Sequence, residues 1–161
     1  MNVTADMDCY AVFKNNASMA RAIVMDTISG DYTNDRVTTM GKYALARCTN
    51  LTSVNFPNVT TVVQGGLEGC TSLVKADFAN VSSLGDYALS GCTSLTALII
   101  RTDAVCTLGG NALRNTPIAS GSGYIYAPKA QVDSYKSGNG WSSYAAQVRA
   151  IEDHPEICGG E

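Results

Sequence analysis

The stretch VTTMGKYALARCTNLTSVNFPN, residues 37–58, recurs at a 22-residue interval as VTTVVQGGLEGCTSLVKADFAN at 59–80 and VSSLGDYALSGCTSLTALIIRTD at 81–103. A fourth copy begins at Val105 and decays after Thr116. A period of about 20–30 residues indicates a solenoid, because one coil cannot bury its own apolar face and must stack on its neighbours. Stacked coils present a continuous surface that suits binding.

Each copy ends in the pattern L-x-x-V-x-F, which is typical of the strand of a leucine-rich repeat. In the first copy, the period of two places Val54 and Phe56 on one side of the strand and Ser53 and Asn55 on the other. The equivalent positions stay apolar in the next copies. We therefore expect an α/β repeat fold, a short leucine-rich-repeat solenoid of parallel strands. Turns and a short helical arc, near 43–48 in the first copy, should join the strands.

Segments outside the repeats are expected to cap the solenoid, since end coils would otherwise expose their cores. Ser18 can cap a short helix at 18–27. A strand at 123–127 should precede helices at 129–137 and 142–151, the second with an apolar stripe. The predicted organisation is an N-terminal cap at 1–36, four coils at 37–122, a C-terminal strand-helix-helix cap at 123–152 and a loose tail at 153–161.

Composition narrows the class of protein. The 161 residues are 45% apolar and 16% charged, which indicates a folded chain, and the net charge is −3. We expect no nucleic-acid partner, because there is no basic patch. We expect no membrane insertion either, because no run approaches about 18–20 apolar residues. The N-terminus does not resemble a secretory signal peptide.

Six cysteines are present, and Cys48, Cys70 and Cys92 occupy the same position in successive coils. They should form an internal ladder of buried free thiols, because a free cysteine behaves as a small apolar residue. A disulfide or a metal site is the alternative interpretation. Parallel Cβ vectors suit a disulfide poorly. No cysteine or histidine spacing matches a zinc site, and we expect neither a metal nor a cofactor.

The sequence offers no catalytic set. Its one histidine, His154, falls in the predicted tail, whereas catalysis needs a held geometry. The carboxylates Glu68, Asp77 and Asp86 come from different positions of the repeat, so they do not indicate an acid–base pair. We expect a protein that is not an enzyme.

The units MGKYALARCTNLTSVNF and LGDYALSGCTSLTALII resemble the BspA-like, or bacterial type-5, leucine-rich repeat. The middle copy departs from this pattern at 63–66, where VQGG replaces the usual glycine-and-tyrosine turn. The C-terminal block is similar to the ends of small repeat proteins from gut Firmicutes and their phages or prophages. The resemblance implies adhesion or recognition at an exposed surface, with no shared catalytic residues.

The outward side of the predicted sheet is the first candidate binding surface, with a solvated face as the alternative. A Lys75–Asp77 charge pair can form on it. Its outward positions are Ser53, Asn55, Lys75, Asp77, Ala97 and Ile99. A second candidate is a ridge at the coil turns, where packing in the cap is the alternative to sugar binding. The residues of that second candidate are Lys42, Tyr43, Asp86 and Tyr87, with Trp141 and Tyr144 in the cap.

These features lead to two functional hypotheses. The first is a non-enzymatic recognition or adhesion module that binds a cell-surface protein or glycan. It would be displayed on a bacterial surface or on a phage particle, and so would be extracellular. The second is a structural or accessory virion protein that contacts other virion proteins and has no ligand of its own.

Overall fold

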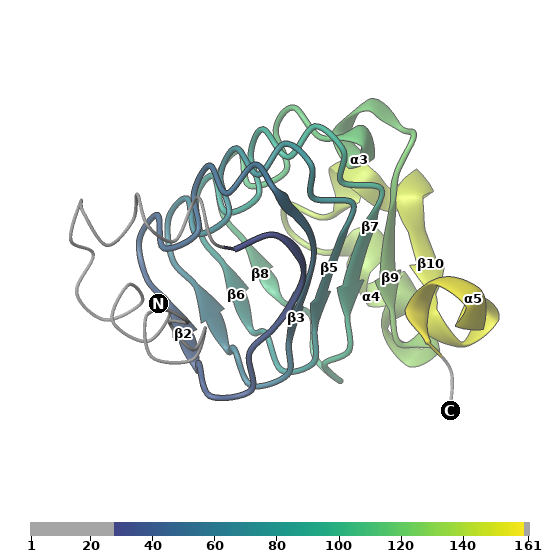
Figure 1. Cartoon of the computed structure of the whole chain (residues 1–161). Coiled ribbons are helices and arrows are strands. Elements are labelled where there is room, and N and C mark those ends of the chain that lie inside the picture. Colours follow the sequence, from purple (N-terminus) through teal and green to yellow (C-terminus); the bar gives the residue numbers. More distant parts are fainter. Residues whose placement is uncertain (1–27, 160–161) are drawn as a thin grey trace, which may run out of the picture.

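Each repeat forms one coil of a solenoid in the computed structural model, which describes residues 28–159 (Figure 1). A coil contributes one strand to each of two parallel sheets, and a run of turns joins the two strands. In the coil at 37–58 these strands are β2 (Thr39–Met40) and β3 (Leu51–Phe56). The predicted leucine-rich-repeat fold with parallel strands is confirmed.

The longer strands form a six-stranded sheet, here called the long sheet. Neighbouring strands pair in register at the repeat interval, so that Ser53 lies opposite Lys75, which lies opposite Ala97. All of its pairs are parallel. In spatial order the strands are β1 (Gly30–Thr33), β3, β5 (Lys75–Phe78), β7 (Ala97–Ile100), β9 (Tyr124–Ala127) and β10 (Val148–Ala150).

A second, four-stranded sheet lies on another side of the coils. This sheet could not be predicted from the sequence, because strands of two residues are too short to show an alternating pattern. Its strands do coincide with an apolar position of the repeat, and Met40, Val62 and Leu84 are buried there. In order the strands are β2, β4 (Thr61–Val62), β6 (Ser83–Leu84) and β8 (Thr107–Leu108).

The predicted helical arc at 43–48 is wrong: this segment is a run of turns. Tyr43 and Arg47 have φ values of 55° and 62°, which an α-helix does not tolerate. Alternate amides therefore point along the solenoid, and the Leu45 N–H donates to the Gly66 carbonyl at 2.8 Å. The turns thus add a third set of backbone hydrogen bonds between coils.

The core consists of columns of equivalent side chains. Phe56 and Phe78 stack with ring centroids 5.9 Å apart, and Tyr32 meets Phe56 edge-on at 5.9 Å. Leu51, Leu73 and Leu95 are fully buried in another column. Each coil therefore buries its apolar side chains mainly against the coils before and after it.

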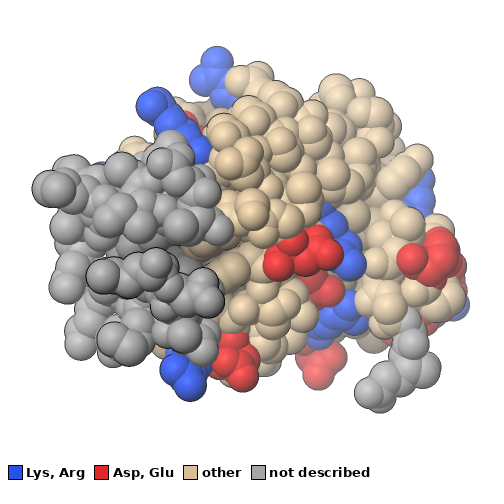
Figure 2. All heavy atoms as spheres, in the orientation of Figure 1, with Lys and Arg blue, Asp and Glu red and all other residues tan. Residues whose placement is uncertain are grey.

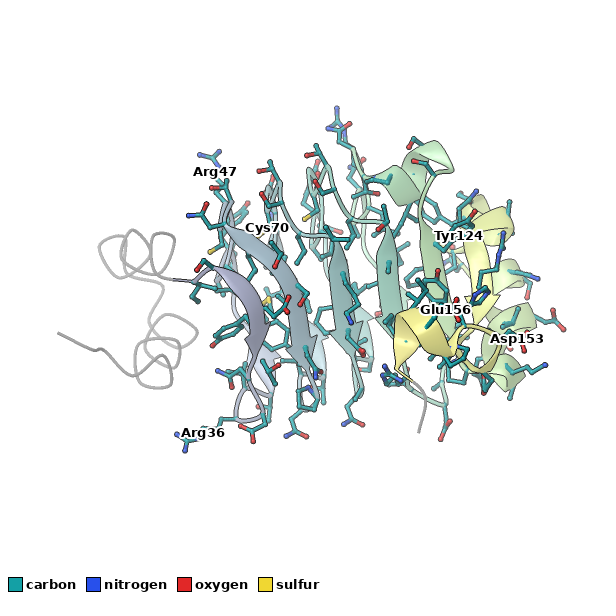
Figure 3. All side chains as sticks on the ribbon, turned by 45° about the vertical axis from the view of Figure 1, so that its right-hand side comes forward. Arg36, Arg47, Cys70, Tyr124, Asp153 and Glu156 are labelled. Carbon is teal, nitrogen blue, oxygen red and sulfur yellow. The ribbon has the colours of Figure 1, made fainter. Side chains whose placement is uncertain are left out.

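The cysteine ladder is present and reduced. All five cysteines within 28–159 are free and buried, whereas Cys9 lies outside the described residues. Cys70, labelled in Figure 3, donates to the Leu45 carbonyl at 3.1 Å, and Cys92 donates to the Leu67 carbonyl at the same distance. The hydrogen bond with Cys92 and burial raise the pKa of Cys70, which keeps its thiol protonated.

The C-terminal end departs from the predicted strand-helix-helix order. The predicted strand is β9, and the first predicted helix is present as a 3₁₀ turn, η1 (Lys129–Gln131), followed by α4 (Val132–Ser137). The second predicted helix is a 3₁₀ segment, η2 (Ser142–Gln147), followed by strand β10. A kink at Tyr144 interrupts η2, which prevents a continuous helix there.

Aromatic side chains close the core at this end. Trp141 and Tyr135 are fully buried, with ring centroids 5.0 Å apart. The Trp141 indole donates to the Cys106 carbonyl, and the Tyr135 hydroxyl accepts from the Cys106 N–H at 3.0 Å. Trp141 therefore belongs to the cap rather than to a binding surface. A short helix, α3 (Pro117–Ser120), also lies here and is capped by the Thr116 hydroxyl.

At the N-terminal end, β1 extends the long sheet next to β3. This strand falls within the predicted N-terminal cap at 1–36. The helix predicted at 18–27 lies outside the described residues.

Replacing Leu73 by alanine should lower the free energy of unfolding by about 2–5 kcal/mol, because it leaves a cavity in the central coil. Urea denaturation measures the change. Val74→Ala is the matched control, since Val74 is 46% exposed and its truncation should change stability by less than about 0.5 kcal/mol. Equal effects of the two substitutions would contradict the register described above.

Stability should also fall at high pH. Burial raises the pKa of the Cys106 thiol from 9.0 to about 12. Between these values the unfolded chain loses a proton that the folded chain retains, so the free energy of unfolding decreases as the pH rises. Urea denaturation at a series of pH values from 9.0 to about 12 measures this slope. Cys106→Ala should make the slope shallower, and an unchanged slope would exclude this thiol as a cause.

Candidate functional site

The long sheet has one face against the core and one face away from it, here called the outer face. Strand register arranges the outer-face side chains in two rows that cross the strands. All six residues predicted to point outward lie in these rows. The first row is Asp31, Ser53, Lys75, Ala97 and Tyr124, and the second is Thr33, Asn55, Asp77, Ile99 and Tyr126.

The N-terminal part of the outer face is polar and accessible; we call it the open half. Asp31 accepts hydrogen bonds from the hydroxyls of Ser53 at 2.6 Å and Thr52 at 3.3 Å. Asp31 is not among the predicted site residues, because it precedes the first recognisable repeat. The open half comprises Asp31, Thr33, Ser53, Asn55 and Lys75, each of them exposed or partly exposed.

In the C-terminal part of the outer face, Asp77, Ala97, Ile99 and Tyr126 are buried, and we call these four residues the covered half, whereas Tyr124 beside them is 38% exposed. Ala97 and Ile99 were predicted to be outward and available, but they are 7% and 0% exposed. They lie beneath residues 151–159, which form η3 (Ile151–Asp153) and α5 (Pro155–Cys158). Figure 3 shows α5, which carries Glu156, against the C-terminal end of the sheet.

The predicted loose tail is therefore wrong as far as Cys158. Cys158 and Ile151 pack against Ala97, Ile99 and Tyr126, and Cys158 is only 4% exposed. We call residues 151–159 the strap. The tail has no repeat or long periodic pattern, so the sequence carried no signal for this packing.

Asp77 pairs with Arg101 rather than with Lys75. The Arg101 guanidinium donates to both carboxylate oxygens, at 2.9 and 2.7 Å, and this contact raises the pKa of Arg101. Arg101 also donates to the Cys158 carbonyl. One arginine thus joins the sheet to the strap. Arg101 is not among the predicted site residues, because it comes directly after the last strand position of its repeat and so lies outside the repeated pattern.

Charged side chains of both signs gather in the middle of this face (Figure 2). Much of the surface around them is neutral in the same view. A surface with charges of both signs favours a polar partner over a partner that is strongly basic or strongly acidic.

The second predicted surface, at the coil turns, serves mainly to join coils. The Tyr43 ring occupies the space above Gly65, where an added Cβ would lie 2.3 Å from it. The Lys42 ammonium lies 5.5 Å from the centre of that ring. Asp86 accepts from the Gly110 N–H at 2.7 Å, and the Tyr87 hydroxyl accepts from the Asn111 amide at 3.3 Å. A hollow of about 410 Å³ beside Tyr43 is lined also by Ala46, Arg47 and Glu68.

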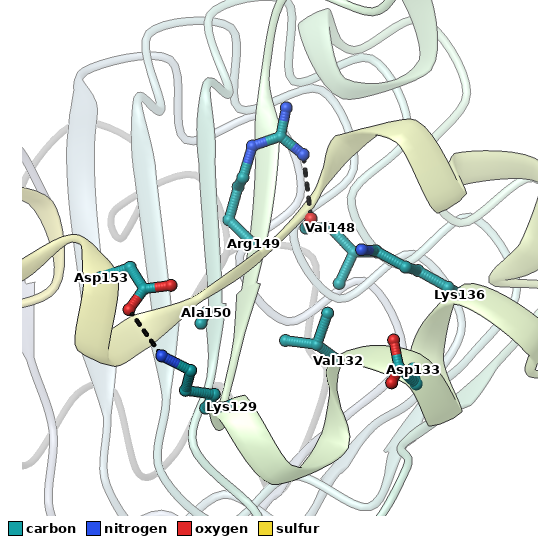
Figure 4. Close-up of a pocket in the computed structure, with 8 residues that line it drawn as sticks. All are labelled: Lys129, Val132, Asp133, Lys136, Val148, Arg149, Ala150 and Asp153. Carbon is teal, nitrogen blue, oxygen red and sulfur yellow. Dashed lines mark hydrogen bonds and ion pairs between the residues drawn. The ribbon is translucent and has the colours of Figure 1, made fainter.

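A further hollow of about 360 Å³ lies beside edge strand β10 (Figure 4). Lys129 pairs with Asp153 at 3.1 Å. Arg149 donates to the Val148 carbonyl at 2.9 Å, and its guanidinium lies 4.7 Å from the centre of the Tyr124 ring. The lining residues are Lys129, Val132, Asp133, Lys136, Val148, Arg149, Ala150 and Asp153.

Between residues 28 and 159, no cluster of three or more histidine, cysteine or acidic side chains is arranged to hold a metal ion. His154 is not in a loose tail: its ring meets Tyr126 edge-on at 5.4 Å and lies 3.2 Å from Glu156. The contact with Tyr126 helps to hold the strap on the sheet, and neither Tyr126 nor Glu156 forms a serine- or cysteine-type catalytic pair with His154.

Stacked parallel coils and an accessible sheet face define a leucine-rich-repeat solenoid. A family model described as BspA type leucine rich repeat region matches residues 27–124 in six copies. The chain therefore belongs to the BspA-type leucine-rich-repeat family. Proteins of this family are generally binding modules rather than enzymes.

A crystal structure of a leucine rich cell surface protein from Faecalibacterium prausnitzii A2-165 has a similar fold. The TM-score is 0.51 and the sequence identity is 19%. The match covers 74% of this chain but only 31% of that protein. Among curated proteins, none matches the chain significantly. The described helices include none with the length and hydrophobicity that a membrane span requires.

Replacing Asp77 by asparagine should lower the free energy of unfolding by about 1–2 kcal/mol, because it removes the charge partner of a half-buried arginine. Asp31→Asn is the control, since Asp31 is exposed and its loss should change stability by less than about 0.5 kcal/mol. Thermal and urea denaturation measure both changes. An Asp77→Asn protein as stable as the control would show that the Arg101 contact contributes nothing.

Proposed function

We propose that the chain is a recognition or adhesion module that binds a cell-surface protein or glycan through the open half of the outer face. It acts outside the cell that makes it, on a bacterial surface or on a phage particle. The ligand is bound and released without chemical change.

The arrangement of the open half carries this proposal. Hydroxyl, amide, ammonium and carboxylate groups project from three neighbouring strands about 4.8 Å apart. The stacked coils beneath hold these strands, so the polar groups need little reorganisation on binding. Ser53, Asn55 and Lys75 offer both donors and acceptors, as sugar hydroxyls and polar protein surfaces require.

Family membership supports a binding role, and the cell-surface protein of Faecalibacterium prausnitzii supports an extracellular location. The open half offers Asp31 and Lys75 as charges but no exposed tryptophan, phenylalanine or tyrosine. Interfaces without aromatic anchors are generally weak. We therefore expect modest affinity for one site and tighter attachment where many copies are displayed together.

Binding of fluorescently labelled protein to intact cells of gut Firmicutes tests the proposal. We expect saturable binding, and a triple variant (S53A, N55A, K75A) should bind about tenfold or more weakly, equivalent to about 1.4 kcal/mol. Arg114→Ala is the control, because Arg114 is exposed on the turn side of the coils.

Stripping wall polysaccharide from the cells, or shaving them with protease, separates the two ligand classes. Loss of binding after the first treatment indicates a glycan, and loss after the second indicates a protein. Wild-type protein that binds no strain would refute the recognition role and favour an accessory virion protein. A triple variant that binds as well as wild type would refute the assigned surface.

A further inference from the structure

The open and covered halves are parts of one continuous surface. Lys75 lies next to Ala97 in the first row, and Asn55 lies next to Asp77 in the second. A ligand that extends along either row from the open half meets the strap within one or two strands. The strap therefore sets the size of the binding surface.

The covered half holds the residue types that usually dominate binding energy. Tyr126 and Arg101 lie under or against the strap; Tyr126 is the partner of Ile99 in the sheet, and Arg101 follows β7 directly. Tyrosine and arginine are enriched among the residues that contribute most to interfaces. The open half provides mainly small polar groups, so Tyr126 and Arg101 are withheld from a ligand there, whereas Tyr124 at the far end of the first row is 38% exposed.

The strap is attached apart from the main core. Its contacts with Ala97, Ile99 and Tyr126 form a separate apolar cluster, whereas the coils share another. The helix α5 has four residues, and Glu156 and Ile157 on it are exposed. A small peripheral cluster can open locally at a lower free-energy cost than global unfolding.

We propose that the strap is a displaceable cover, which blocks the covered half until a ligand on the open half, or a change in the surroundings, releases it. This regulation rests on the proposed binding function of the same face. When the strap leaves, Arg101 loses the Cys158 carbonyl and can donate to the ligand instead, while Asp77 continues to hold its guanidinium.

Two conformations follow, closed and open, and a ligand that needs the covered half binds only the open one. Its apparent affinity is reduced by the fraction of molecules that are open. Ligand binding in turn shifts the population toward the open form.

Cys158 reports directly on strap opening, because this strap residue is buried by its packing on Ala97, Ile99 and Tyr126. A thiol-reactive reagent is added to the folded full-length chain, and mass spectrometry follows Cys158 and Cys92 separately. Cys92 lies in the main core. We expect Cys158 to react about tenfold or more faster than Cys92, because local opening exposes only the former. Equal rates would show that the strap leaves only on global unfolding, and would overturn the proposal.

The effect on binding is tested with a chain that ends at Asp153, which keeps β10 and the Lys129–Asp153 pair. Cell binding should be about tenfold tighter than for the full chain if the strap is open about a tenth of the time. Cys158→Glu, which places a charge in the apolar cluster, should act in the same direction and serves if the shortened chain does not fold. Ile157→Ser is the matched control, since Ile157 is 37% exposed on the same helix and outside the cluster.

Equal binding by the full chain and by the chain that ends at Asp153 would overturn the regulation alone. If neither chain bound any strain, the proposed function would fall, and the regulation with it. Faster labelling of Cys158 in the presence of cells would support ligand-driven release of the strap.

Discussion

Backbone hydrogen bonding between successive coils is the constraint on which the rest of the structure depends. Each coil donates to its neighbour from the long sheet, the short sheet and the turns, always in the same register. Equivalent side chains must therefore stack, so each position of the repeat becomes a column. Apolar columns form the core, the cysteine column hydrogen-bonds to carbonyls of the preceding coil, and the outward columns form the two rows of the outer face.

The repeat itself could be predicted from sequence because a column leaves a periodic trace. Leu51, Leu73 and Leu95 recur at a fixed interval, as do the other apolar positions, and this recurrence with the L-x-x-V-x-F pattern indicates parallel strands. Contacts that occur once leave no such trace. The Asp77–Arg101 pair and the packing of Cys158 join segments that belong to no common period. The prediction of a helical arc at Tyr43 and Arg47 is wrong because a pattern of apolar residues does not indicate which residues have positive φ angles.

The same distinction explains the outcome for the candidate site. The direction of all six outward residues follows from strand alternation, and the structure has them in two rows. Their accessibility depends instead on what covers them, which is a property of the chain's end and not of the repeat. Ser53 and Asn55 remain accessible, whereas Ala97 and Ile99 are buried. Direction was thus predictable and exposure was not.

The glycine at position 65 has a consequence for how such arrays evolve. In the flanking coils the equivalent residue is a tyrosine, and the Tyr43 ring fills the space that a side chain at position 65 would need. The coils at 37–58 and 59–80 therefore fit together because the tyrosine ring of the first occupies the space left by the glycine of the second. Duplication of the coil at 37–58 would place a second tyrosine at the position that is now Gly65, where an added Cβ would lie 2.3 Å from the Tyr43 ring. A coil of this array is therefore fitted to the side chains of its neighbour as well as to the shared repeat pattern.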